Sequence, residues 1–278
     1  MKRILIVVLV LLATGAQATY LIGRNGAVLK PFQVFAWLNA SYGRSEKSYN
    51  WDSTRYVALP AASRIASTAG EVSAAVGLPG KLELGLTVPL FMKARDTFFA
   101  AGPGDLMIHA RYGILQSKLL PVKLAATLGV NVPTSDKDAN PALGDRTIDA
   151  GLGLAAVTSS LGKLTLHGRA GYWLNGKTND TTKVGNLFEY IAVADYAVCK
   201  CFIPELALSG TVAGQRQVNG TAVAHSESSI HNVGLLFIFK PLPMLVVRPK
   251  VSMPLEFASK GASLAPYTVG LDVWATFP

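Results

Sequence analysis

Apolar and polar residues alternate one by one along much of the chain, as in the stretch 163–175, KLTLHGRAGYWLN. Leu164 and Tyr172 fall on one face of this pattern, whereas His167 and Arg169 fall on the other. Successive side chains of a β-strand point to opposite faces, so a period of two indicates a strand with one apolar and one polar face. In a helix, the same charges would be spread around the axis.

The same alternation recurs along the chain, in segments long enough to cross a bilayer as tilted strands. We expect strands at 31–43, 64–78, 82–91, 104–115, 121–133, 145–157, 163–175, 187–199, 205–217, 229–240, 244–256 and 266–277. The strand that ends at Leu78 runs down to a short turn, so one ascending strand must precede it, and residues 31–43 fit this role. The total is then twelve, an even number as bacterial single-chain barrels require. Segment 229–240 is apolar on both faces, so its orientation stays open.

The connections between these segments alternate between short and long. Short turns are expected at 79–81, 116–120, 159–162, 200–204 and 240–243. Longer polar loops are expected at 44–63, 93–103, 134–144, 176–186, 218–228 and 257–264. This alternation is typical of a transmembrane barrel with periplasmic turns and extracellular loops. A lysine lies in or beside each short turn, where it either anchors the rim at lipid phosphates or keeps the turn soluble: Lys81, Lys118, Lys163, Lys200 and Lys240.

Aromatic residues lie near both ends of the apolar faces, as the two interfaces of a membrane favour. The residues near the outer ends are Tyr172, Phe188, Tyr190 and Tyr267, and those near the inner ends are Tyr112, Tyr196 and Phe277. The alternative is a soluble β-sandwich, which does not need strands this long or loops that alternate so regularly. The sequence therefore predicts an all-β fold, a transmembrane antiparallel up-and-down barrel of about 12 strands.

The first residues resemble a secretory signal. Lys2 and Arg3 precede the apolar run 4–12, and Ala16-Gln17-Ala18 has the pattern that a signal peptidase cleaves. We expect a signal peptide at 1–18, with a buried helix as the alternative, and an outer-membrane barrel at 19–278. The expected location is the bacterial outer membrane.

Half of the chain is apolar, yet the longest apolar run after the signal, 233–239, is far shorter than the roughly 20 residues of a spanning helix. A barrel is the other structure that satisfies every backbone group within lipid. The net charge is +9, but the basic residues are scattered and form no nucleic-acid-binding motif. We therefore expect no nucleic-acid partner.

Residues with metal or nucleotide chemistry are sparse. Cys199 and Cys201 are expected to be free thiols, because on a strand their Cα atoms lie at the limit for a disulfide. No further metal ligands lie near them in sequence, so no metal site is predicted. The spacing Gly151-x-Gly153 is followed by neither a helix nor a third glycine, so no nucleotide cofactor is expected.

Several stretches of sequence that cover expected strands and turns are similar to those of one known family. The order GDLMIHARYGIL, LPVKLAATLGVNVPTSD, DAGLGLAAV and LGKLTLHGRAGYWLNGKT resembles the outer-membrane proteins named for the meta-pathway of phenol degradation. The resemblance covers about residues 70–195 and, more loosely, the rest. It implies an outer-membrane channel or transporter, in some members associated with the catabolism of aromatic compounds. Outer-membrane barrels usually end in Phe, whereas here Pro278 follows the last aromatic residue, Phe277.

The polar faces of the strands supply the candidate site. The residues expected to line a pore and set its selectivity are Asp105, His109, Arg111, Lys123, Asp149, His167, Arg169, Glu189, Asp195, Arg248, Lys250 and Asp272. Charges inside a barrel must be paired or hydrated, so they either fill a closed lumen or border a narrow aqueous path. We favour a narrow or gated pore, with a barrel that acts only as a structural or surface scaffold as the alternative.

Catalysis is a weaker hypothesis. His109 and His167 are available, but a triad needs a serine and a carboxylate in reach, and the chain has no G-x-S-x-G motif. The chain is therefore not expected to be an enzyme. If the pore is open, the basic cluster of Arg111, Lys123, His167 and Arg169 is expected to favour small anions, such as carboxylates of aromatic acids. The expected partners are this solute, outer-membrane lipid and lipopolysaccharide, and the barrel assembly machinery.

Overall fold

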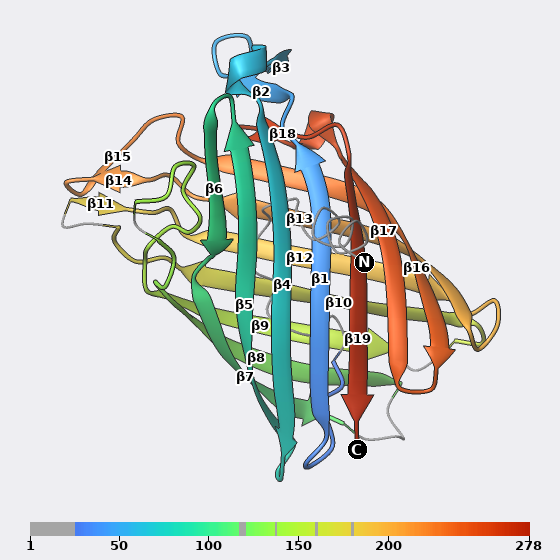
Figure 1. Ribbon diagram of the computed structural model, residues 1–278. Helices are drawn as coiled ribbons and strands as arrows, with labels where there is room; N and C mark the ends of the chain where they lie inside the picture. Colours follow the sequence, from blue (N-terminus) through green and yellow to red (C-terminus); the bar gives the residue numbers. More distant parts are fainter. Residues whose placement is uncertain (1–25, 117–120, 137, 159–160, 179–180) are drawn as a thin grey trace, which may run out of the picture.

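The computed structural model describes residues 26–116, 121–136, 138–158, 161–178 and 181–278. They form a closed barrel of antiparallel strands (Figure 1). The twelve strands of the barrel wall are β1 (Val34–Arg44), β4 (Ile65–Leu78), β5 (Leu82–Arg95), β7 (Leu106–Leu115), β8 (Val122–Val132), β9 (Asp149–Thr158), β10 (Leu164–Leu174), β12 (Leu187–Tyr196), β13 (Phe202–Ala213), β16 (Ser228–Leu242), β17 (Leu245–Pro254) and β19 (Thr268–Phe277). The predicted fold class is confirmed.

The strands pair in chain order, and β1 closes the cylinder because it pairs with both β4 and β19. Val34 at the start of β1 lies opposite Phe277 at the end of β19, so the first and last strands meet at the same end. The short turns lie at this end, which we call the turn end, and the longer connections lie at the loop end (Figure 1).

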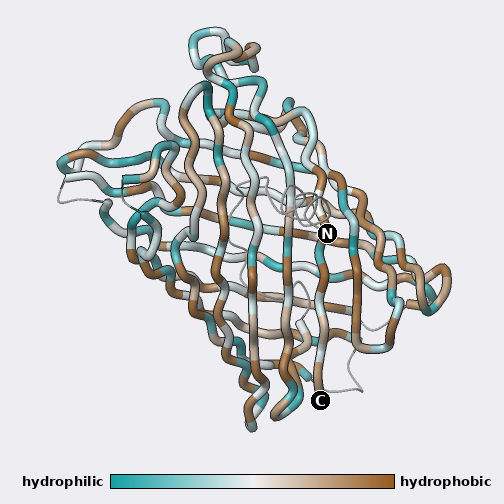
Figure 2. Tube along the Cα trace, viewed as in Figure 1, coloured by the Kyte–Doolittle hydropathy of each residue, from teal (hydrophilic) through white to brown (hydrophobic). Residues whose placement is uncertain are grey.

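The side chains follow the period of two. Outward-facing apolar residues on many strands are roughly half exposed, among them Leu38, Leu86, Ile108, Leu128, Leu154, Leu208 and Leu235. Buried charges occupy the alternate positions, and Figure 2 shows hydrophobic and hydrophilic residues interspersed along the strands, with hydrophilic stretches in the long loops. In β16, Asn232 and Leu236 face inward while Leu235 and Phe239 face outward, which settles the orientation of the segment that is apolar on both faces.

Two small sheets stand at the loop end. The first combines β2 (Lys47–Asn50), β3 (Arg55–Ala58) and β18 (Ser263–Leu264), with the short helices η1 (Ala61–Ser63) and η2 (Glu256–Ala258) beside them in the chain. The second combines β11 (Thr182–Lys183), β14 (Gln217–Val218) and β15 (Thr221–Ala222). The first sheet projects above the barrel (Figure 1). In its long loop, Tyr49 packs against both Trp51 and Tyr56, and none of the three lines the cavity in the lumen.

The expected loop at 93–103 is wrong. β5 continues to Arg95, turns at residues 96 and 97, and returns as β6 (Phe98–Pro103), which pairs with the outer half of β5. Asp96 takes a left-handed backbone conformation at this tight turn, with φ 53°. The sequence predicted a loop here because the charged residues Lys93 and Arg95 follow the apolar run, but both belong to β5.

The turn end carries lysines and thiols. Lys81, Lys163, Lys200 and Lys240 are exposed there, whereas Lys118 and the expected signal peptide, 1–18, lie outside the described residues. Cys199 and Cys201 are exposed free thiols in the turn between β12 and β13, with their Sγ atoms 2.7 Å apart. Within the described part of the chain, there is no helix long and apolar enough to cross a membrane.

A charge on the outer wall tests whether it faces lipid. Leu154 lies midway along β9 and is 52% exposed, so Leu154→Arg is expected to lower the free energy of unfolding by about 2–4 kcal/mol in lipid vesicles. Phe99→Arg, near the loop end of β6, is expected to cost only about 0–1 kcal/mol. Guanidinium unfolding followed by tryptophan fluorescence measures both values. Equal costs at the two positions would contradict a bilayer centred on the barrel wall.

Candidate functional site: the ion-paired lumen

Inward-facing charges meet as ion pairs across neighbouring strands. Arg111 on β7 lies directly opposite Glu83 on β5, with 3.1 Å between Nη1 and Oε1. Arg169 on β10 lies 3.1 Å from Glu189 on β12, between Nη2 and Oε1. All four side chains are at least 96% buried. A buried charge is costly unless it is paired, so each arginine requires its carboxylate.

A larger cluster joins β17, β19, β13 and β1. Asp272 is fully buried and accepts hydrogen bonds from the guanidinium of Arg248, from Lys250 Nζ at 2.9 Å and from Asn39 Nδ2 at 2.5 Å. Arg248 also reaches across the lumen wall to Glu205, with 3.4 Å between Nη1 and Oε2. Its guanidinium lies 5.0 Å from the ring centroid of Trp274. One arginine thereby ties two carboxylates and an aromatic ring into a single polar network.

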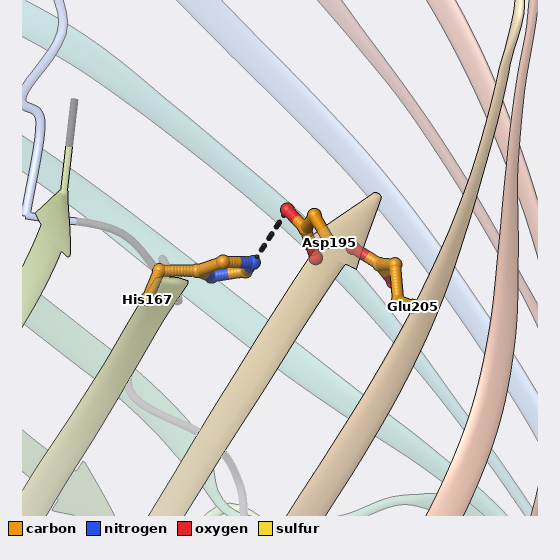
Figure 3. Close-up of side chains that lie close together, drawn as sticks. All are labelled: His167, Asp195 and Glu205. Atoms are coloured by element: carbon orange, nitrogen blue, oxygen red, sulfur yellow. Dashed lines mark hydrogen bonds and ion pairs between the residues drawn. The ribbon is translucent and has the colours of Figure 1, made fainter. Parts of the chain in front are cut away.

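A third cluster contains a histidine. His167 Nε2 on β10 lies 2.8 Å from Asp195 Oδ2 on β12, and Glu205 on β13 stands directly opposite Asp195 in the strand register. Figure 3 shows the three side chains projecting from three consecutive strands toward one another. All three border the cavity described next.

The lumen encloses a cavity of about 570 Å³ with a mixed lining. Its aromatic lining residues are Phe35, Trp37, Phe91 and Trp274, and its larger aliphatic ones include Leu29, Val157, Ile191, Leu236, Ile238 and Val251. Its charged lining consists of four basic residues, Arg111, Arg169, Arg248 and Lys250, and four acidic residues, Glu71, Glu83, Asp195 and Glu205. Because the basic and the acidic lining residues are equal in number, their charges sum to zero, with His167 not counted.

The segment 26–30 enters the lumen from the turn end. Gln116 Nε2 donates to the carbonyl of Gly26 at 2.6 Å, Arg111 Nη2 donates to the carbonyl of Ala27 at 3.2 Å, and Glu83 accepts from the Leu29 N–H at 3.0 Å. A Cβ at Gly26 would overlap the Lys123 carbonyl oxygen, so only glycine fits at this contact. Three residues of the segment, Ala27, Val28 and Leu29, therefore form part of the cavity lining.

The predicted site residues divide by position. Arg111, His167, Arg169, Asp195, Arg248 and Lys250 line the cavity, while Glu189 and Asp272 are fully buried partners of lining arginines. The predicted basic cluster is not a purely basic wall, because Glu83 and Glu189 accompany its arginines. Lys123, which belongs to the same predicted cluster, borders Gly26 through its backbone.

The remaining candidates lie elsewhere in the wall. His109 is 2% exposed and packs against Gly85, where a side chain would collide with its ring. Asp105 accepts hydrogen bonds from the backbone N–H groups of Thr134, Ser135, Asp145 and Arg146 and so organises the loop end. Asp149 does the same at 2.9 Å for the N–H of Gly176. These two aspartates therefore fix the backbone of the connections at the loop end.

Sequence analysis missed the aromatic lining and one acid. The period of two in the first strand places Phe35 and Trp37 on the face opposite Leu38, and Trp274 shares the inward face of Asp272. These signals were present, but only charged residues were counted as pore candidates. Glu71, which is 8% exposed, falls on the inward face of β4 in the same way.

This barrel is similar to the proteins of one family and to solved outer-membrane structures. The family model described as "Putative MetA-pathway of phenol degradation" matches residues 20–264. No sequence among curated proteins matches the chain. An outer membrane channel from Pseudomonas putida F1 is similar in structure, with a TM-score of 0.79 over 95% of this chain and 100% of that one, at 14% identity.

Two porins are more distantly similar in structure. The NanC porin superposes with a TM-score of 0.54 at 8% identity, covering 87% of this chain and 99% of its own. The KdgM porin gives 0.51 at 9% identity, covering 88% of this chain and 99% of its own. At such low identities, these likenesses establish the outer-membrane barrel fold.

The hydrogen bond from Gln116 to Gly26, which helps to fix segment 26–30, can be tested by substitution. Gln116→Ala removes the donor to Gly26, so the segment is expected to loosen and the single-channel conductance in planar bilayers to rise severalfold. Gln215→Ala, which loses a hydrogen bond to Glu227 at the loop end, serves as the control and should leave the conductance unchanged. An unchanged conductance in Gln116→Ala would show that this segment does not limit the path.

Proposed function

This chain belongs to the family described as "Putative MetA-pathway of phenol degradation", and we propose that it is an outer-membrane channel for small organic molecules, aromatic carboxylates among them. The observation that carries the proposal is the lumenal cavity of about 570 Å³, in which aromatic and aliphatic side chains alternate with ion pairs. Pockets for small organic molecules have this character, an apolar lining with a few placed polar groups.

The lining suits a solute with an apolar body and one polar end. Phe35, Trp37 and Trp274 offer ring faces to an aromatic body, and Lys250, whose side chain is 26% exposed, offers a cation to a carboxylate. Because each lining arginine has a carboxylate nearby, selectivity between anions and cations is expected to be weak. Size and apolar character then decide which solutes pass.

The alternative is a closed barrel with a structural role, which the hydrogen-bonded segment 26–30 favours. We also propose that the chain is not an enzyme, because His109 is packed against Gly85 and His167 is engaged by Asp195. Lipopolysaccharide around the loop end and the barrel assembly machinery remain proposed partners.

Uptake into proteoliposomes tests the channel directly. Benzoate is expected to enter proteoliposomes faster than glucose, because glucose lacks an apolar body to replace its hydration inside the cavity. Liposomes without protein and liposomes with a heat-denatured sample are the controls. Equal leakage of both solutes in all samples would support the closed barrel and contradict the channel.

Charge selectivity depends on which member of a pair is removed. Arg169→Ala leaves Glu189 without this cation and should shift the reversal potential in a salt gradient toward cation preference. Glu189→Gln should shift it toward anion preference. Each change is also expected to cost about 3–5 kcal/mol of stability, because it breaks a buried pair. Shifts of the same sign in both variants would refute the assignment of this pair to the pore wall.

A further inference from the structure

We propose that His167, Asp195 and Glu205 form a binding site for a divalent transition-metal ion, such as Zn²⁺, in the wall of the lumenal cavity. One ligand atom from each residue, the imidazole nitrogen and two carboxylate oxygens, lies within 4.8 Å of the others. The three residues come from β10, β12 and β13, and their convergence is visible in Figure 3. A rigid wall of paired strands therefore fixes the geometry.

The strand register brings two like charges together. Asp195 and Glu205 are directly opposite on adjacent antiparallel strands, where like charges are normally destabilising. Glu205 has a side chain that is fully buried, and Asp195 has one that is 18% exposed. Two carboxylates in such a position require positive charge between them or beside them.

The positive charge available is unevenly distributed. Arg248 approaches Glu205 at 3.4 Å, but it makes its shorter contact, 2.7 Å from Nε, with Asp272. Asp195 contacts His167 through Oδ2, while its buried Oδ1 atom has no hydrogen-bond partner among the residues that the structure describes. The His167 side chain is 94% buried, and its Nδ1 atom is likewise without a partner there. A cation between these ligands would complete the charge balance.

The ligand set suits a borderline cation. One imidazole and two carboxylates are ligands that Zn²⁺ accepts, and sites with three protein ligands keep a further position open. All three residues line the cavity, so the open position would face the path of the solute. Arg248 would act as an outer partner that orients the Glu205 carboxylate.

This placement deepens the proposed function on which it rests. A metal ion with an open position in the cavity wall would bind the carboxylate or phenolate oxygen of an organic solute. The Ile191 and Trp37 side chains, which also line the cavity, would contact the apolar body. The site would thus select solutes by an oxygen ligand in addition to size.

Titration of the metal-free protein with Zn²⁺ by isothermal calorimetry tests the site. The background must be Cys199→Ser with Cys201→Ser, because the exposed thiols at the turn end would otherwise bind Zn²⁺ themselves. We expect one Zn²⁺ per barrel. Asp195→Asn, Glu205→Gln and His167→Gln should each weaken the affinity by at least about tenfold. Replacement of Zn²⁺ by Co²⁺ should give the intense visible absorption of a low-coordinate site, lost in the same variants.

Glu71→Gln is the matched control, because it removes a carboxylate from the cavity lining outside the cluster and should retain Zn²⁺ binding. Heat-modified mobility on gels verifies that each variant is folded. The inference is overturned if the thiol-free barrel binds no Zn²⁺ or if the three substitutions leave the affinity unchanged. Benzoate flux measured without metal separates the two proposals. Flux in a protein that binds no Zn²⁺ would refute only the metal site. Zn²⁺ binding in a protein without flux would refute only the channel.

Discussion

The pairing of buried charges across neighbouring strands is the interaction on which this barrel depends. The outer wall faces lipid, so every charge must point inward, and inside it must meet an opposite charge or water. Glu83 with Arg111, Glu189 with Arg169, and Asp272 with Arg248 satisfy this condition. The arginines of these pairs line a cavity of about 570 Å³ inside the wall.

That space gives the lumen its chemical character. Aromatic rings from β1 and β19 stand beside guanidinium groups, as Trp274 does beside Arg248. Segment 26–30 is held by Gln116 and by both members of the Glu83–Arg111 pair, so the same ion pair that stabilises the wall also fixes this segment inside the lumen.

The sequence predicted the fold almost completely, because a period of two fixes both the strand and its orientation. It placed Arg169 and Leu164 on opposite faces from position alone. It could not predict the pairing of Arg169 with Glu189, since partners on adjacent strands depend on a register that loop lengths do not reveal. For the same reason, it missed the meeting of His167, Asp195 and Glu205, which lie on three different strands. No alternation of apolar and polar residues predicted that segment 26–30 lies inside the lumen.

The central claim is that a continuous solute path runs past the ion-paired wall, and cysteine accessibility measures it most directly. In a protein with Cys199 and Cys201 replaced by serine, Ser209→Cys places a thiol on the cavity wall, and Leu208→Cys places one on the lipid face. A charged, water-soluble thiol reagent is predicted to react with the cysteine at 209 and reduce the single-channel current, while the cysteine at 208 has no effect. Failure of the cysteine at 209 to react in folded protein, or reaction without any change in current, would contradict the account.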